Sequence, residues 1–332
     1  MPDGDSIAEG REHAFLKNLC DRLQAETPLS AGEIGPGDDG AVFAPQDGSM
    51  VATTDALVEN VHFRSGWVSP EELGCRAVAA NLSDLAAMGA TPTRILLSLI
   101  LPETISETTT EALTMAVAHE ARNQGAILAG GNLSRGAELS ITITALGRLD
   151  GPALLRSGAS PDELLVVTGN LGDAALAVHL WESGEIPGPA LREKFTRPKP
   201  RLRAGQVLAR AGATSAIDIS DGLLADLGHL CRASGVGAVV ERESLPRSSA
   251  VDKKDQSGAD FAANGGEDYE LLVTLPRSLD RDLAKLAGQC GIGLSVIGST
   301  TDQIGSISLM DGMGAPHRPT RHGFDHFARE TS

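Results

Sequence analysis

The stretch SAIDISDG at residues 215–222 carries the signals that decide the fold. Ser215–Ile219 predicts a short buried strand whose one charged residue is Asp218. A polar turn at 220–222 follows, and a helical pattern continues to about residue 234. A strand that ends in acidic residues beside a glycine and leads into a helix is typical of α/β proteins, which bind ligands at the carboxyl ends of strands. This stretch therefore predicts both the fold class and the place of a functional site.

Both halves of the chain mix strands and helices in the same way. The first half predicts helices at 7–25, 70–88 and 105–124 and strands at 50–57, 94–101, 126–129 and 139–147. The second half predicts helices at 201–212, 223–234 and 277–290 and strands at 164–168, 215–219, 237–240, 270–275 and 293–299. We expect an α/β fold with α+β character, in which each domain is a mixed β-sheet packed with helices.

The length of 332 residues favours two domains. Residues 149–162 are rich in Gly, Pro, Ser and Asp, which is typical of a boundary between domains. We expect a first domain at 1–150 and a second at 151–332.

The overall charge and the cysteines exclude several classes of function. The chain has 28 Lys and Arg against 44 Asp and Glu, a net charge of −16, so we expect no binding to nucleic acid or to an anionic membrane surface. The longest apolar run, near 95–101, is too short to span a membrane, and no signal peptide is visible at the start. Its four cysteines form no C-x-x-C pair, so zinc and dithiol sites have no support and a cytoplasmic location is expected.

A glycine-rich segment, GPGDDG at residues 35–40, matches the dinucleotide pattern G-x-G-x-x-G but does not fit its chemistry. Asp38 and Asp39 lie inside the loop, and their carboxylates would repel a phosphate that approached directly. No Gly-Lys pair occurs in the chain, so a Walker A loop is excluded. If a nucleotide binds, a metal ion must bridge it to the protein.

Several carboxylates have the surroundings that Mg²⁺ sites use. Asp55 closes TTD at 53–55, and Asp84 lies among small apolar residues in a predicted helix, where an unpaired carboxylate is costly. Mg²⁺ takes few protein carboxylates and leaves positions for substrate phosphates. Each residue also has an ordinary structural interpretation. A single Asp in a Gly turn usually forms the turn, and Ser220 and Asp221 could cap a helix.

Other candidates carry the same ambiguity. His62 could contact a substrate or simply lie at the surface. Arg156 could hold a phosphate or form a surface ion pair. Phe324 could stack on an aromatic ligand or anchor the chain end in the core.

Taken together, these stretches resemble the thiamine-monophosphate kinase family, in order and over nearly the whole chain. The matching stretches are GDDGA at 37–41, TTD at 53–55, VHF at 61–63, ANLSDLAAMGA at 80–90, GGN at 130–132, RSGA at 156–159, VTG at 167–169, RP at 197–198, PR at 200–201, IDISDGL at 217–223, GGEDYEL at 265–271 and GFDHF at 323–327. An ordered set of this length is far more specific than any single motif.

The resemblance implies a homodimer that transfers the γ-phosphoryl group of ATP to thiamine monophosphate with several Mg²⁺ ions. It also implies that the domain at 1–150 binds metal and ATP and forms the dimer, and that the domain at 151–332 completes the ATP and substrate site. The family's metal positions map onto Asp39, Thr53, Thr54, Asp55, Asp84, Asn132, Asp218 and Asp221. Its ATP contacts map onto Gly131, Asn132, Arg156 and Ser220, and its thiamine phosphate contacts onto His62, Glu267 and Phe324.

Two positions depart from the family. Many relatives have Asp where this chain has Asn132, which keeps an oxygen ligand but drops a charge. Relatives often have Tyr or Trp where this chain has Phe324, which can stack but cannot donate a hydrogen bond.

The implied reaction agrees with the charge of the protein. Two anionic substrates can meet on a chain of net charge −16 if Mg²⁺ neutralises them. We expect no catalytic base, because a phosphate acceptor is already largely ionised at neutral pH, and we expect direct in-line transfer. Two alternatives stay open: another ATPase of the superfamily, which includes aminoimidazole ribonucleotide synthetase, or a non-catalytic dimer that binds Mg-nucleotide for regulation.

Overall fold

The structure, a computed structural model, describes residues 11–28, 48–254, 256–313 and 315–317. Its contacts divide the chain into two compact units that interleave in sequence. The first includes residues 54–78 and 93–144, and the second includes 48–53, 79–92 and the chain from 145 onward. Strand β1 (Met50–Val58) and helix α2 (Pro70–Ala87) therefore contribute residues to both units. A domain boundary near residue 150 stays a prediction.

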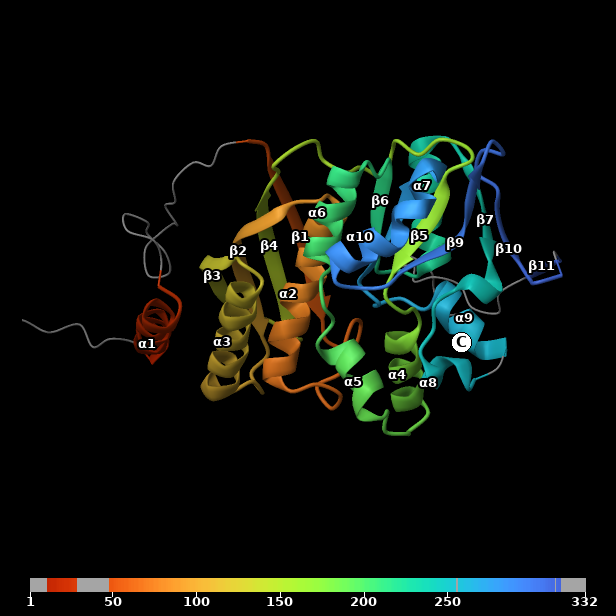
Figure 1. Ribbon diagram of the computed structural model, residues 1–332. Helices are drawn as coiled ribbons and strands as arrows, with labels where there is room; N and C mark the ends of the chain where they lie inside the picture. Colours follow the sequence, from red (N-terminus) through yellow and green to blue (C-terminus); the bar gives the residue numbers. More distant parts are fainter. Residues whose placement is uncertain (1–10, 29–47, 255, 314, 318–332) are drawn as a thin grey trace, which may run out of the picture. The chain divides into compact units, whose positions relative to one another are not determined.

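A four-stranded sheet in the order β1-β4-β2-β3 supports the first unit (Figure 1). Its other strands are β2 (Thr91–Leu101), β3 (Ile127–Arg135) and β4 (Ser140–Arg148). Burial alternates strictly along β4, which confirms the half-buried strand that its sequence predicts. Strand β3 is longer than predicted because it pairs in parallel with β2 as far as Arg135, opposite Leu101.

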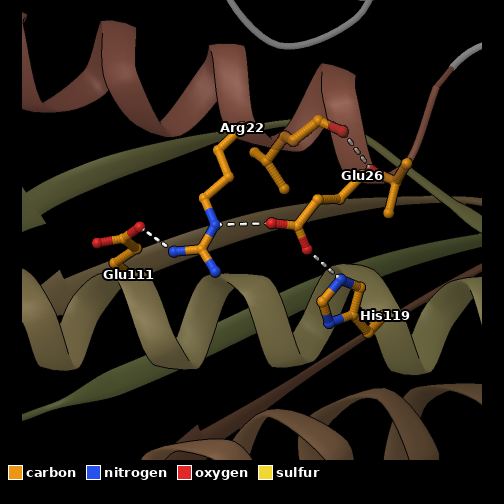
Figure 2. Close-up of polar contacts among 6 residues, drawn as sticks. Arg22, Glu26, Glu111 and His119 are labelled. Atoms are coloured by element: carbon orange, nitrogen blue, oxygen red, sulfur yellow. Dashed lines mark hydrogen bonds and ion pairs between the residues drawn. The ribbon is translucent and has the colours of Figure 1, made fainter.

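Helix α3 (Glu107–Asn123) packs against β3, and helix α1 (Arg11–Glu26) contacts α3 in turn. Ser106 caps α3 by accepting the N–H of Thr109 at 3.1 Å. Figure 2 shows the polar contacts between α1 and α3: Arg22 bonds Glu26 and Glu111, and His119 bonds Glu26 at 2.8 Å. These side chains are well exposed, so each pair contributes little to stability.

A seven-stranded sheet in the order β11-β10-β7-β9-β5-β8-β6 forms the second unit (Figure 1). The strands are β5 (Leu164–Thr168), β6 (Ser215–Ile219), β7 (Gly237–Glu241), β8 (Glu270–Leu275), β9 (Leu294–Thr301), β10 (Ile307–Met310) and β11 (Pro316–His317). Neighbouring strands are antiparallel except β10 and β7.

Some helices of the second unit pack on the two faces of this sheet, and others pack against neighbouring helices. The helices are α4 (Asp173–Glu182), α5 (Pro189–Thr196), α6 (Leu202–Ala211), α7 (Leu223–Ser234), α8 (Ser249–Asp252), α9 (Gln256–Asn264) and α10 (Leu283–Cys290). Short 3₁₀ helices occupy Arg242–Ser244 and Arg277–Asp282, so the single helix predicted at 277–290 is wrong in its first half. Strands β10 and β11 were not predicted at all.

Two apolar cores on opposite faces of the sheet position the site. Ile217 and Ile219 of β6 face the core that includes α7, whereas Ala216 faces the core that includes Ala86 and Ala87 of α2. Side chains alternate along a strand, so Asp218 shares the face of Ala216. The alternation of β6 therefore turns Asp218 toward the carboxyl-terminal part of α2, which carries Asp84. The predicted α/β class is confirmed. No helix in the described part of the chain is long and apolar enough to cross a membrane.

A candidate active site at the end of strand β6

Asp218 and Asp84 form the centre of the candidate site. Asp218 is 4% exposed, and Asp84 is half-buried on α2. Thr53 of β1 donates its hydroxyl hydrogen to Asp84 Oδ2 at 2.6 Å. Three segments that are far apart in the sequence therefore bring two carboxylates and a hydroxyl together, and all three residues belong to the second unit.

The electrostatics of this centre are unfavourable as it stands. Burial raises the pKa of the Asp218 carboxyl, and the negative charge of Asp84 raises it further. Ser83 and the positive charge of Arg156 lower this pKa but do not compensate. The two carboxylates thus repel one another in a poorly solvated place. A cation between them would remove this penalty.

The turn after β6 carries the next two candidates, Ser220 and Asp221, both half-buried. The N–H groups of Ser220, Asp221 and Gly222 all donate to Oδ2 of Asp226 at 3.1 Å. Asp226 lies in the first turn of α7 and is 3% exposed. Burial raises the pKa of its carboxyl to about 8, and the charges of Asp218 and Asp221 contribute.

A second turn, residues 264–269, lies against the first. The N–H of Glu267 donates to Ser220 O at 2.8 Å, and the N–H of Tyr269 donates to Ile219 O at 2.9 Å. Glu267 and Tyr269 both adopt left-handed φ angles, 74° and 51°, which are rare for residues with side chains. The Tyr269 hydroxyl also donates to Glu267 Oε2 at 2.6 Å. Backbone strain of this kind is concentrated at functional sites.

Two glycines allow the turns to approach this closely. A Cβ on Gly266 would lie 2.5 Å from Ser220 O, and a Cβ on Gly222 would lie 2.7 Å from Asn264 O. Gly222 also has a φ of 119°, which disfavours any other residue. These contacts explain why glycines recur in both motifs. Glu267 is thereby held next to Ser220.

The remaining candidates in the described part of the chain lie in other surroundings. Arg156 is exposed, and its carbonyl accepts the Ser234 hydroxyl at 2.9 Å. Thr54 belongs to the first unit and donates its hydroxyl hydrogen to Ile143 O at 3.1 Å. Asp55, also in the first unit, accepts the N–H of Ala56 at 2.8 Å.

His62, Gly131 and Asn132 also belong to the first unit. The N–H of Val58 donates to His62 Nδ1 at 3.0 Å, and Asn132 donates to the Ser134 hydroxyl at 3.0 Å. A Cβ on Gly131 would lie 2.1 Å from Leu97 O. Asp39 and Phe324 lie outside the described residues, so their predicted roles stay predictions.

A third group of polar residues near the site was missed from the sequence. Arg201 bonds both carboxylate oxygens of Glu270, with Nε to Oε2 at 2.6 Å and the second contact at 2.5 Å. The Thr168 hydroxyl donates to Glu270 Oε2 at 2.7 Å and accepts the N–H of Leu271 at 2.9 Å. Glu270 is the first residue of the otherwise apolar strand β8, and a buried charge requires a partner. The sequence could therefore have predicted that Glu270 has a charged partner. Asp226 could have been predicted to bond backbone N–H groups, because it is an acidic residue in the first turn of a predicted helix.

The donor set around Asp218 fits a hard divalent cation. Carboxylate and hydroxyl oxygens are ligands that Mg²⁺ accepts, and one or two carboxylates suffice when substrate phosphates and water complete the shell. Within the described residues, no three His, Cys, Asp or Glu side chains gather closely enough to hold a metal by themselves.

Comparison with known proteins identifies the family. Residues 37–149 match the N-terminal domain of AIR synthase related proteins, and residues 160–309 match their C-terminal domain. The thiamine-monophosphate kinase of Salmonella typhimurium strain LT2 is 41% identical and covers 96% of this chain and 98% of its own.

Two solved structures agree. The thiamine-monophosphate kinase of Stenotrophomonas maltophilia K279a has a TM-score of 0.81 and 38% identity over 90% of this chain and 96% of its own. AaThiL, solved with AMPPCP and TMP, has a TM-score of 0.73 and 28% identity over 97% of this chain and all of its own. On its two matched domains and on the length and identity of these alignments, the chain belongs to the thiamine-monophosphate kinase family.

Proposed function

We propose that this protein transfers the γ-phosphoryl group of ATP to thiamine monophosphate, which gives thiamine diphosphate and ADP. The observation that carries the proposal is the Asp218–Asp84 pair. Thr53 donates a hydrogen bond to Asp84, and the Ser220–Gly222 turn follows Asp218 in the chain. This arrangement needs cations and offers them few protein ligands, which suits a reaction between two phosphates. The ATP analogue AMPPCP and TMP in the solved relative support the same pair of substrates.

Asp84 and Asp218, with the Thr53 hydroxyl beside Asp84, would supply ligands to Mg²⁺ in the second unit, and Asp221 is proposed as a further ligand from the turn after β6. Because these three carboxylates do not gather closely enough to hold one ion by themselves, substrate phosphates would complete its coordination shell. The bound ion would neutralise phosphate oxygens and lower their mutual repulsion. The family positions Asp39, Thr54, Asp55 and Asn132 are proposed as further ligands. We propose that several Mg²⁺ ions bind.

The chain's own groups orient the substrates. Ser220 and Arg156, with Gly131 and Asn132, are proposed to bind ATP. Glu267 is held beside Ser220 by two backbone bonds and by Tyr269, and it is proposed with His62 and Phe324 to bind thiamine monophosphate. The acceptor phosphate is already largely ionised at neutral pH, so the transfer requires positioning and charge neutralisation and no general base.

A turnover assay with ATP and thiamine monophosphate tests the function. We expect Mg²⁺-dependent formation of thiamine diphosphate that stops in excess chelator. Full turnover in chelator would contradict the role of the metal. ATP binding without turnover would favour a regulatory nucleotide-binding dimer. ATP hydrolysis at a rate that does not depend on thiamine monophosphate would favour another ATPase of the superfamily.

We further propose a cytoplasmic homodimer that pairs through the first unit. Leu96 and Ile100 are each 39% exposed, and they lie four residues apart on one face of β2, where a second copy could cover them. Light scattering at micromolar concentration should give twice the mass of one chain, and a monomer would contradict the proposal. All four cysteines are free thiols, which supports a reducing compartment.

A further inference from the structure

Asp226 holds the turn after β6 in an unusual way. A single oxygen, Oδ2, accepts three consecutive backbone N–H groups, from Ser220, Asp221 and Gly222, each at 3.1 Å. The residue is 3% exposed, so water does not compete with the amides for this oxygen. Convergent backbone amides of this kind normally bind an anion from outside the chain. Here the chain supplies the acceptor itself.

These contacts differ from an ordinary helix cap. Helix α7 begins at Leu223, and its N-cap residue is Gly222. A capping side chain usually satisfies one or two amides at the helix start. The amides of Ser220 and Asp221 precede the helix and belong to the turn that carries the candidate ligands. Asp226 therefore acts on the turn as well as on its own helix.

The carbonyl groups of the same segment are held from the other side. Ile219 O and Ser220 O accept the N–H groups of Tyr269 and Glu267 at 2.9 and 2.8 Å. Donors and acceptors of the turn are thus both satisfied within the protein. These bonds fix the backbone of the turn, and the backbone sets the orientation of the Ser220 and Asp221 side chains. Without Asp226, only the carbonyl side remains held.

We propose that Asp226 is a positioning residue, whose single acceptor oxygen orients the Ser220–Gly222 turn so that Asp221 and Ser220 meet the metal and the nucleotide. This inference rests on the proposed function of the site. One oxygen makes all three bonds, so the position of that oxygen matters and the charge does not.

Two substitutions separate position from charge. Asp226→Asn keeps an acceptor oxygen at the same distance from the backbone and removes the charge. Asp226→Glu keeps the charge and displaces the oxygens by one methylene. Asp173→Glu serves as the matched control, because Asp173 is also a buried carboxylate in the first turn of a helix, α4, but bonds Ser248 and none of the turn amides.

Three measurements apply to each variant: affinity for Mn²⁺ without nucleotide, hydrogen exchange of the peptide that contains residues 220–222, and kcat with the KM for each substrate. We expect Asp226→Asn to match the unsubstituted protein in all three. For Asp226→Glu we expect an affinity for Mn²⁺ about 10- to 100-fold weaker, the range found when a group that orients a metal ligand is lost. Exchange at 220–222 should be faster, and kcat should fall while the KM for thiamine monophosphate stays unchanged.

Each other outcome overturns the inference. Loss in Asp226→Asn with normal Asp226→Glu would show that the charge matters. Normal Mn²⁺ affinity in both variants, or equal loss in Asp173→Glu, would show a role in general stability only. The Mn²⁺ and exchange measurements need no turnover. If the protein fails to phosphorylate thiamine monophosphate, they still decide the role of Asp226, and the proposed function fails separately.

Discussion

Two buried carboxylates on the paired strands β6 and β8 have opposite surroundings. Glu270, 1% exposed, receives both nitrogens of Arg201 and the Thr168 hydroxyl. Asp218, 4% exposed, faces a second carboxylate, Asp84. In the described part of the chain, no arginine or lysine forms an ion pair with Asp218. The fold neutralises one charge and leaves the other.

The contrast separates a structural role from a functional one. A buried ion pair with good geometry is satisfied by the protein alone, and removing one partner leaves an uncompensated charge. Two neighbouring carboxylates repel one another, and their repulsion is relieved when one takes up a proton or when a cation binds. We therefore expect substitutions at Glu270 or Arg201 to cost stability, and substitutions at Asp218 or Asp84 to cost activity.

The largest effect should follow the loss of Arg201. Arg201→Ala leaves Glu270 charged and buried, which should lower the free energy of unfolding by about 3–5 kcal/mol in urea denaturation. Arg210→Ala is the matched control, because its contact with Asp150 at 3.7 Å is exposed and should contribute less than about 1 kcal/mol. Equal losses in the two variants would remove the distinction between the buried and exposed pairs.

The next effect concerns the carboxylate pair itself. Asp84→Asn removes a charge from a site that would hold the metal, so kcat should fall by about 10²–10³-fold, the range for one lost electrostatic contact at a reacting centre. The melting temperature should not fall, because repulsion with Asp218 is relieved. Steady-state turnover and a thermal melt measure the two. Unchanged turnover would remove Asp84 from the site.

The stabilisation of the protein by bound Mg²⁺ should be a smaller effect, and it should differ between the two carboxylates. Mg²⁺ at ten times its Kd should stabilise the protein by about 1.4 kcal/mol through mass action, and a chelator should reverse this. We expect Arg201→Ala to keep this increment and Asp218→Asn to lose it. Thermal melts with and without Mg²⁺ provide the measurement. The same increment in Asp218→Asn would place the ion elsewhere.

The smallest effect concerns Asp268, a buried carboxyl that accepts the N–H of Gly172 at 2.8 Å. Burial raises its pKa well above the usual value, and the charges of Glu270 and Asp173 add to this. The folded protein then binds a proton that the unfolded chain releases, so stability from this group falls as pH rises above about 4.

Asp268→Asn keeps an acceptor for Gly172 and removes the titration. The stability of this variant relative to the original should therefore improve between pH 5.5 and pH 8, as measured by urea denaturation at both values. A relative stability that does not change with pH would show that Asp268 stays ionised in the fold.

Local sequence was sufficient for three neighbouring strands at one end of the second sheet. The predicted bounds of β5, β6 and β8 agree with the structure because each is a short apolar run between turn residues. Strands β10 and β11, at the other end of the sheet, were missed, since only their pairing with neighbouring strands makes them strands. The glycine motifs predicted turns, but the close approach of the two turns is made by residues far apart in the sequence, Gly222 against Asn264 and Gly266 against Ser220.

The sequence by itself determined the fold class, the family resemblance and the types of chemical group at the site. These depend on periodicity and residue identity, which are local properties. Only the tertiary structure decided which carboxylate is neutralised. It brought Arg201 to Glu270 and Asp84 to Asp218, and it directed three amides of one turn to Asp226. Such partners are chosen by packing across distant segments, and electrostatic energy depends on distance and burial, which no local pattern contains.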